Sequence, residues 1–381
     1  MSNYKAFAVT ATGGSHIKHG KGCEDACFKH EDASACIAVV ADGHGDDNCF
    51  RSAKGSALAV ACAAKGLREF VELHKSKFSH GLFNRKTPPM QEDFNKILHD
   101  VVKHIVALWQ VKVEEDYTAH PFTAEELEKA DEKHRKKYET DKGSSNKAYG
   151  TTLIAAVITP YYWLGIHIGD GRLTALYADG TFDQPVPWDE KCYLNVTTSI
   201  CDDDAYEQAR CYFSYHEDKT PPVAVFLCSD GIDDNYPVDG NEKYLYKLYR
   251  TIAITFAEDG FESTCKQLND LANSFATKGK GDDTSIAGFI DMETLKQAVR
   301  GWEKQIAEEE EASEKTTAEK TQAAAEAEPE KPEVVIPNTM ARAVAAYKKK
   351  LGIIKGGSVE DYGGFFPENR NTKKPANGKD G

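Results

Sequence analysis

Short apolar runs and longer helical patterns divide the first 295 or so residues into strands and helices. Runs bounded by glycine, proline or polar residues predict strands at 5–10, 25–30, 35–41, 151–160, 161–171, 172–180, 222–231 and 283–291. The strands at 161–171 and 172–180 are expected to be joined by a tight turn. Helices are predicted over 52–74 and 263–277, and 91–139 reads as long helices with charged faces. Residues 139–150 read as a loop. Groups of strands with helices between them are typical of an α+β layered fold.

The composition changes after Trp302. Residues 303–333 hold eleven acidic residues and four lysines, so 11 − 4 leaves a net charge of minus seven. Such a segment lacks the apolar surface to fold alone, and we interpret 303–335 as an acidic linker. In 336–381 we expect a short basic helix followed by a disordered tail. The helix either forms only transiently or docks on an acidic surface of this chain or of a partner protein.

Length and charge limit the classes of function. With 381 residues, 40% of them hydrophobic, the chain can form one large domain with extensions. A formal net charge of −14 argues against a general nucleic-acid binder, which needs clustered Lys and Arg. The ten cysteines contain no C-x-x-C pair, and neither a signal peptide nor a long apolar segment is evident. We therefore expect a cytoplasmic protein with reduced thiols and no membrane partner.

Carboxylates recur at the ends of the predicted strands. Asp42, Asp170 and Asp230 each follow an apolar run and each precede a glycine. Asp282 and Asp283 lie just before the last strand, and Glu24 and Asp25 lie in an early loop. One such Asp-Gly pair is an ordinary turn. If several of these strand ends meet, however, their mutual repulsion requires cations to offset it.

Oxygen ligands of this kind suit Mg²⁺ or Mn²⁺ rather than zinc. The glycine after Asp42 lets the backbone approach a metal closely. An acid that bridges two ions can support the attack of an activated water in line at phosphorus. A histidine two residues after that acid, here His44, could protonate the departing alkoxide.

The ordered set "CEDA", "VADGHG", "YGTTLIAAVI", "HIGDGR", "LCSDG" and "GDDTSIAGF" resembles the metal-dependent serine/threonine protein phosphatases of the type 2C (PPM) family, in particular their bacterial branch. The resemblance spans roughly residues 8–291. It implies a four-layer αββα sandwich, in which helices flank two antiparallel sheets and a dinuclear centre lies at one edge. The helices over about 76–147 match less closely and are interpreted as an insertion into a catalytic domain of residues 1–295.

The resemblance also implies roles for single residues. Two Mg²⁺ or Mn²⁺ ions per site are implied, with a third, weaker one, and a bridging water attacks phosphoserine or phosphothreonine in a protein substrate. By position, Asp42 matches the ligand that bridges the two main ions, and Gly43 matches the residue that supplies a carbonyl oxygen. Asp230 and Asp282 match ligands of one main ion, Glu24 matches an acid that acts on the other main ion, and Asp170 matches the acid at the third ion. His44 matches the general acid.

Several positions depart from the family pattern. Cys23 replaces the usual Asn or Gln, and Gly20 stands where an arginine often grips the substrate phosphate. Lys18, Lys21 or Arg51 could replace that arginine, and we assign the role to Lys21 and Arg51. Asp283 stands where Asn is common, a change expected to matter little if Asp282 is the ligand.

Three classes of function stay open at this point. The first is a phosphoserine/phosphothreonine phosphatase. The second is an inactive binding protein on the same fold, against which the presence of Asp42, His44, Asp230 and Asp282 argues. The third is a metal-dependent hydrolase of a small phosphorylated molecule.

Overall fold

The structure is a computed structural model that describes residues 3–79, 88–140, 142–187, 189–192, 196–237 and 240–302. The predicted linker, basic helix and tail, with the docking partner proposed for them, lie outside the described residues. The described strands form two antiparallel sheets of five strands each. In order across sheet A they are β1 (Tyr4–Ala11), β10 (Thr284–Asp291), β9 (Ala224–Cys228), β6 (Arg172–Leu176) and β7 (Phe182–Asp183). In order across sheet B they are β2 (Ala26–Glu31), β3 (Cys36–Ala41), β4 (Leu153–Ile158), β5 (Tyr162–Ile168) and β8 (Arg210–Tyr215).

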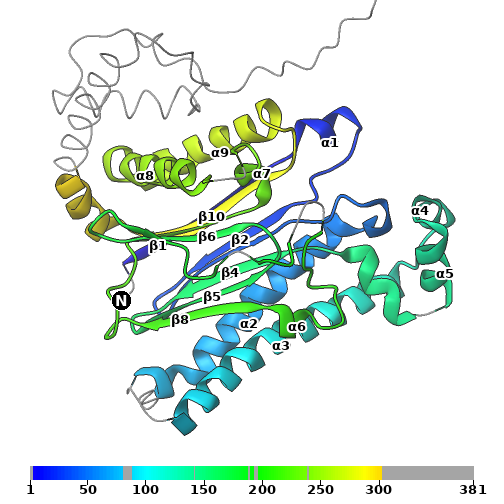
Figure 1. Ribbon diagram of the computed structural model, residues 1–381, viewed down its shortest axis with the longest axis horizontal. Helices are drawn as coiled ribbons and strands as arrows, with labels where there is room; N and C mark the ends of the chain where they lie inside the picture. Colours follow the sequence, from blue (N-terminus) through cyan, green and yellow to red (C-terminus); the bar gives the residue numbers. More distant parts are fainter. Residues whose placement is uncertain are drawn as a thin grey trace, which may run out of the picture. The chain divides into compact units, whose positions relative to one another are not determined.

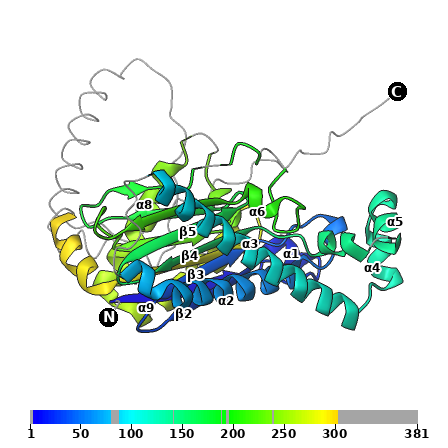
Figure 2. The same ribbon diagram turned by 90° about the horizontal axis from the view of Figure 1, so that it is seen from below.

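Helices cover the outer faces of both sheets (Figures 1 and 2). Sheet B packs against α2 (Ser52–Ser79), with α3 (Pro88–Ala119) beside α2. Sheet A packs against α9 (Phe261–Lys278), with α8 (Glu242–Asp259) beside it. The shorter described helices are α1 (Gly14–Lys18), η1 (Asp47–Cys49), α4 (Ala124–Lys129), α5 (Glu132–Thr140), η2 (Lys142–Tyr149), α6 (Ala205–Gln208) and α7 (Asp230–Asp233). The predicted αββα sandwich is confirmed.

Burial of both sheet faces explains the continuous apolar runs of the central strands. In β3, Ile37 and Val39 pack with the residues of α2 and α3, whereas Ala38 and Val40 pack between the two sheets. An antiparallel strand exposed on one face alternates between apolar and polar residues. The inner strands of this sandwich have no solvent face, so every position in β3 is apolar and buried.

The strand register brings the predicted acid-bearing loops to one end of the sandwich. In sheet B, Ala26 at the start of β2 pairs with Ala41 at the end of β3. In sheet A, Arg172 at the start of β6 pairs with Cys228 at the end of β9. Because neighbouring strands run in opposite directions, the end of one lies beside the start of the next. Loops far apart in the sequence therefore meet at this edge.

The chain crosses from sheet B to sheet A at Gly169–Gly171. The two strands on either side of this turn therefore do not pair with each other as the strands of a hairpin would. The predicted turn between β5 and β6 exists, but β5 belongs to sheet B and β6 to sheet A. Gly169 has a φ of 108°, which disfavours a side chain, and a Cβ on Gly171 would collide with the carbonyl oxygen of Cys228. Asp170 therefore lies in the connection from one sheet to the other.

Other local predictions were wrong or incomplete. Residues 142–149, expected as a loop, form the 3-10 helix η2. Helix α8 and strands β7 and β8 were not predicted. Within the predicted insertion, α3 belongs to the helical layer on sheet B, while α4 and α5 stand beyond the sheets (Figure 1). Among the described residues, no helix is both long enough and apolar enough to cross a membrane.

Candidate metal centre

Asp42 is held by two threonines at the start of β4. Its backbone N–H donates to Thr152 Oγ1 at 3.0 Å. Its carbonyl oxygen accepts hydrogen bonds from Thr151 Oγ1 at 2.7 Å and from the Thr152 N–H at 2.8 Å. Three hydrogen bonds on one residue fix the backbone from which the Asp42 carboxylate extends. The "GTT" sequence therefore supports the site without supplying an acid to it.

Gly43 passes through a space too narrow for a side chain. Its N–H donates to the carbonyl oxygen of Glu24 at 3.2 Å. A Cβ at this position would lie 2.5 Å from that oxygen and 3.0 Å from the backbone of Ser52. Glycine is required here because the loop after β3 touches both the early loop and the start of α2.

The acids from separate loops form one cluster. Asp42 and Asp230 are close enough to share a hydrogen bond, and the charges of Asp25 and Asp170 also act on Asp42. Burial, followed by these neighbouring charges, raises the pKa of Asp42 well above its usual range. Burial raises the pKa of Asp230 to about 8, with Asp170, Asp282 and Asp25 adding to the increase. Such a cluster is costly to ionise without a compensating cation.

Asp25 belongs to this cluster, although only its neighbour Glu24 was assigned a role. It is 6% exposed, and its Oδ2 accepts a hydrogen bond from Ser229 Oγ at 2.8 Å. Burial raises its pKa to about 7, against the lowering effect of the Ser229 and Ser285 side chains. The signal in the sequence is its place next to Ala26, the first residue of β2.

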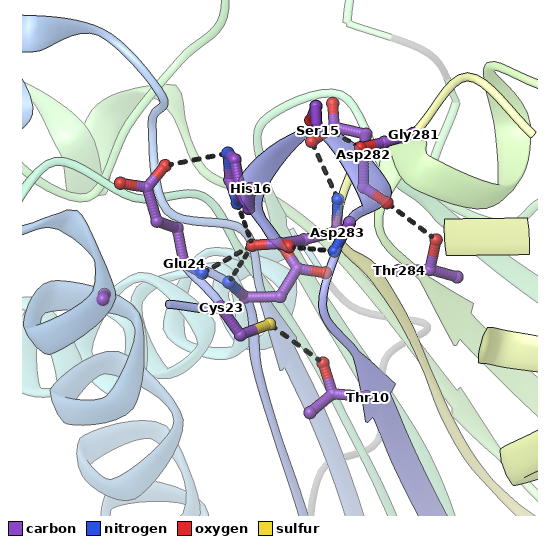
Figure 3. A network of polar contacts seen from close by, with 12 residues as sticks. Thr10, Ser15, His16, Cys23, Glu24, Gly281, Asp282, Asp283 and Thr284 are labelled. Atoms are coloured by element: carbon purple, nitrogen blue, oxygen red, sulfur yellow. Dashed lines mark hydrogen bonds and ion pairs between the residues drawn. The ribbon is translucent and has the colours of Figure 1, made fainter. Parts of the chain in front are cut away.

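Asp283 is a second residue that was assigned no role from the sequence, and its contacts argue against the expectation that it matters little. It is buried and accepts backbone hydrogen bonds from Gly13 at 2.6 Å and Glu24 at 2.5 Å. His16 from α1 lies beside it, with Nδ1 at 3.0 Å from Asp283 and Nε2 at 3.6 Å from Glu24 (Figure 3). An ionised carboxylate accepts at both oxygens, whereas Asn has one acceptor oxygen. Asp283 thus ties the loop that carries Glu24 to the start of β10.

His44 packs tightly at the rim of the cluster. Its backbone N–H donates to the carbonyl oxygen of Gly150 at 3.1 Å, and a Cβ on Gly150 would lie 2.6 Å from His44 Cδ2. Burial lowers the pKa of His44 to about 4; Asp202 and Asp46 oppose this effect, and Lys147 adds to it. In the free protein at neutral pH the imidazole is therefore uncharged. A negatively charged substrate beside it would favour the protonated form.

A cleft of about 630 Å³ is formed by residues of η2, of the segment 191–204 and of α6. It is lined by Lys147, Asp202 and Thr197, among others, and Thr197 hydrogen-bonds to Asp170. Lys147 Nζ forms an ion pair with Asp202 at 2.8 Å. Residues of its lining thus act on both sites: the charges of Lys147 and Asp202 act on His44, and Thr197 acts on Asp170.

The surroundings of Arg51 argue against its predicted role in phosphate binding. Its Nε and Nη2 donate to the two carboxylate oxygens of Glu126 at 2.7 and 2.8 Å. The remaining N–H groups donate to Tyr149 Oη and to the carbonyl oxygens of His120 and Pro121. All of its donors are thus engaged by protein groups. Lys21 is exposed, and its charge favours ionisation of Glu24.

The donor set fits hard divalent cations. Asp25 Oδ1 and Glu24 Oε2 are buried and accept no hydrogen bond from the described residues, so both have lone pairs available. Searched over the described part of the chain, however, no three His, Cys, Asp or Glu side chains converge as a ready coordination shell. Because burial and neighbouring charges favour the protonated form of Asp42, binding a cation requires loss of a proton and reorientation of the carboxylates.

The clustered acids predict an unusual pH dependence of stability. Asp230 has a pKa of about 8 in the folded protein, so the folded state holds more protons than the unfolded state up to that pH. In chelator, raising the pH from 7 to 8 should therefore lower Tm, by about 2–4 °C for each kcal/mol lost. The range from pH 7 to pH 8 lies above the ordinary pKa of histidine and below the ordinary pKa of cysteine, so ordinary residues of these types contribute little to the change. Thermal unfolding of wild type and Asp230→Asn measures the effect: the variant should show a smaller fall, and Mn²⁺ should remove it. An equal fall in both proteins would contradict the charge cluster.

Comparisons with known proteins show which family the chain belongs to. A family model described as "Protein phosphatase 2C" matches residues 12–271. Similar solved structures include the serine/threonine phosphatase Stp1 from Staphylococcus aureus, with 15% identity over 75% of this chain and 94% of that chain and a TM-score of 0.42. PppA of Pseudomonas aeruginosa has 15% identity over 76% and 98% with a TM-score of 0.43. The catalytic domain of the phosphatase PstP in complex with two manganese ions has 14% identity over 75% and 97% with a TM-score of 0.42. No curated protein matches the chain. Because the family model covers well over half of the sequence, this chain belongs to the protein phosphatase 2C family.

Proposed function

We propose that this protein is a metal-dependent phosphatase that hydrolyses phosphoserine and phosphothreonine in protein substrates. Its family is metal-dependent and acts on phosphoproteins. The observation that carries the proposal is the gathering of Asp25, Asp42, Asp170 and Asp230 from four loops at one end of the sandwich. Buried carboxylates in this number favour the binding of cations over the binding of an uncharged ligand.

We further propose that two Mg²⁺ or Mn²⁺ ions bind here, with a third, weaker ion near Asp170. Asp42 would contact both main ions, Gly43 would offer its carbonyl oxygen, Asp230 and Asp282 would hold one ion, and Glu24 would act on the other. Bound ions of this kind lower the pKa of water and polarise a phosphoryl group for in-line attack. In this proposal Asp25 and Asp283 orient the loops that carry these ligands.

The protein residues have separate tasks in the proposed reaction. In this proposal His44, two residues after Asp42, gives a proton to the departing serine or threonine oxygen. Lys21 is the candidate for attracting the substrate phosphate, since Gly20 replaces the usual arginine and Arg51 is engaged elsewhere. The backbone anchors on Asp42 and Gly43 keep the acid loop in place while the phosphate binds.

A substrate panel distinguishes the alternatives. Phosphoserine and phosphothreonine peptides, small phosphorylated metabolites and an aryl phosphate are each assayed with Mn²⁺, and kcat/KM is compared. We expect peptides to exceed the metabolites by at least about 10-fold, which corresponds to about 1.4 kcal/mol of extra transition-state binding. Higher values for a metabolite would favour the small-molecule hydrolase. Binding of phosphopeptides with no turnover of any substrate would favour an inactive binding protein.

A further inference from the structure

Two helices outside the four layers of the sandwich contact the loop that follows β3. Helices α4 and α5 lie beyond the sheets (Figures 1 and 2), and contacts from their side chains and from the backbone of Asp131, just before α5, reach residues 48–51 of that loop. We infer that α4 and α5 hold this loop in the geometry that places His44, so that Glu126 and Tyr138 are positioning residues for the reaction. The inference rests on the proposed function, because His44 is assigned its task there.

The first connection is an ion pair between α4 and the end of the loop. Glu126 accepts from Nε and Nη2 of Arg51, a two-point contact that fixes both side chains. Arg51 is half-buried, and its guanidinium stacks 4.7 Å from the centre of the Phe122 ring. Its backbone N–H donates to the carbonyl oxygen of Ala148 at 2.8 Å. Arg51 therefore joins α4, the loop and η2.

The second connection is made by α5 to Asn48. The hydroxyl of Tyr138 donates to the carbonyl oxygen of Asn48 at 2.7 Å. Asn48 Oδ1 accepts from the backbone N–H of Asp131 at 3.0 Å, just before α5. Tyr138 is buried, and its ring meets Phe50 edge-on at 5.7 Å. Phe50 also packs edge-on against Phe122 at 4.9 Å, which closes an aromatic cluster between the loop and the two helices.

These contacts act on His44 more than on the acids of the metal centre. Asp42 and Gly43 have their own anchors in Thr151, Thr152 and Glu24, on the sheet side of the loop. His44 donates its backbone N–H to Gly150, two residues after Ala148, which accepts from the Arg51 N–H, so α4 and α5 act on His44 both along the loop and through the end of η2. A shift of residues 48–51 should therefore move His44 while leaving Asp42 in place. Small displacements of a catalytic group can cost up to about 100-fold in rate.

The test uses two variants that remove contacts but keep side-chain size. Tyr138→Phe deletes the hydroxyl that donates to Asn48, and Glu126→Gln weakens the pair with Arg51 while Gln still suits the helix cap formed with Thr123. We expect kcat for a phosphoserine peptide to fall about 3- to 10-fold in each variant and about 10- to 100-fold in the double variant. Hydrolysis of an aryl phosphate, whose leaving group needs no proton, should change less than about 2-fold. Manganese affinity by calorimetry should stay within about 2-fold of wild type.

Two controls make the result specific. Tyr161→Phe alters an exposed tyrosine in the turn between β4 and β5, at the opposite end of the sandwich, and should leave both rates unchanged. In a His44→Ala background, Tyr138→Phe should cause no further loss on the peptide. Equal losses on peptide and aryl phosphate, or wild-type kinetics in the double variant, would overturn the inference. Absence of activity in the wild-type protein would instead contradict the proposed function itself.

Discussion

Asp42→Asn and Asp230→Asn should each reduce kcat/KM for a phosphoserine peptide by more than about 100-fold with saturating Mn²⁺. Loss of a residue that only supports a metal ligand typically costs 10- to 100-fold, so loss of a ligand charge should cost more. Asn keeps the size of the side chain but removes one of the charges that attract the cation. The folded state should survive, because each substitution removes a buried carboxylate from a crowded cluster.

Calorimetric titration with Mn²⁺ separates a loss of binding from a loss of chemistry. Both variants should bind the ion more weakly than wild type does, with unchanged circular dichroism. The matched control is Asp179→Asn, in the turn after β6 at the opposite end of sheet A, which should behave like wild type. A rate close to wild type in either Asp42→Asn or Asp230→Asn would remove that residue from the centre.

His44→Ala should show the second largest effect, and the effect should depend on the leaving group. A general acid contributes about 10²–10⁴-fold when the departing oxygen is strongly basic, as in serine, and little when it is an acidic phenol. We therefore expect a loss of at least about 100-fold on a phosphoserine peptide and of less than about 10-fold on an aryl phosphate. Parallel measurements of kcat on both substrates give the ratio directly.

The lowered pKa of His44 makes this a demanding test of its role. Because the pKa of His44 is about 4, its imidazole is uncharged in the free protein at pH 7. The imidazole must therefore take up its proton together with the substrate. If His44 is the acid, the peptide rate should fall as the pH rises, while the His44→Ala rate should lack that dependence. Equal losses on both substrates at every pH would assign His44 a structural role.

The sequence was sufficient to predict the layered fold and the approximate place of the acids. Asp42, Asp170 and Asp230 follow apolar runs, and antiparallel pairing brings such ends to one edge. It could not show that β5 and β6 lie in different sheets. An inner strand of a sandwich is apolar on both faces. Its sequence of apolar residues therefore looks the same whichever of the two sheets it belongs to.

Residues that act through tertiary contacts were the ones missed or misassigned. Asp283 looked like a neutral replacement, yet it accepts backbone hydrogen bonds from Gly13 and Glu24, more than 250 positions away in the sequence. Arg51 looked like a free cation because its partner Glu126 lies 75 residues later, on a helix whose packing no local pattern specifies. Its charge is already paired in the folded chain. Local sequence patterns identify residues that could bind or catalyse. The hydrogen-bond and ion-pair partners of those residues depend on the fold.

The most direct test of the account is phosphopeptide hydrolysis by the wild-type protein before and after removal of metal. Protein stripped with chelator and dialysed is assayed with a phosphoserine peptide alone, with Mn²⁺ and with Mg²⁺, and phosphate release is measured. A cluster of hard oxygen ligands that needs cations predicts less than about 1% of full activity without metal and recovery when either ion is added. Full turnover in the metal-free protein, with the metal content checked by mass spectrometry, would contradict it.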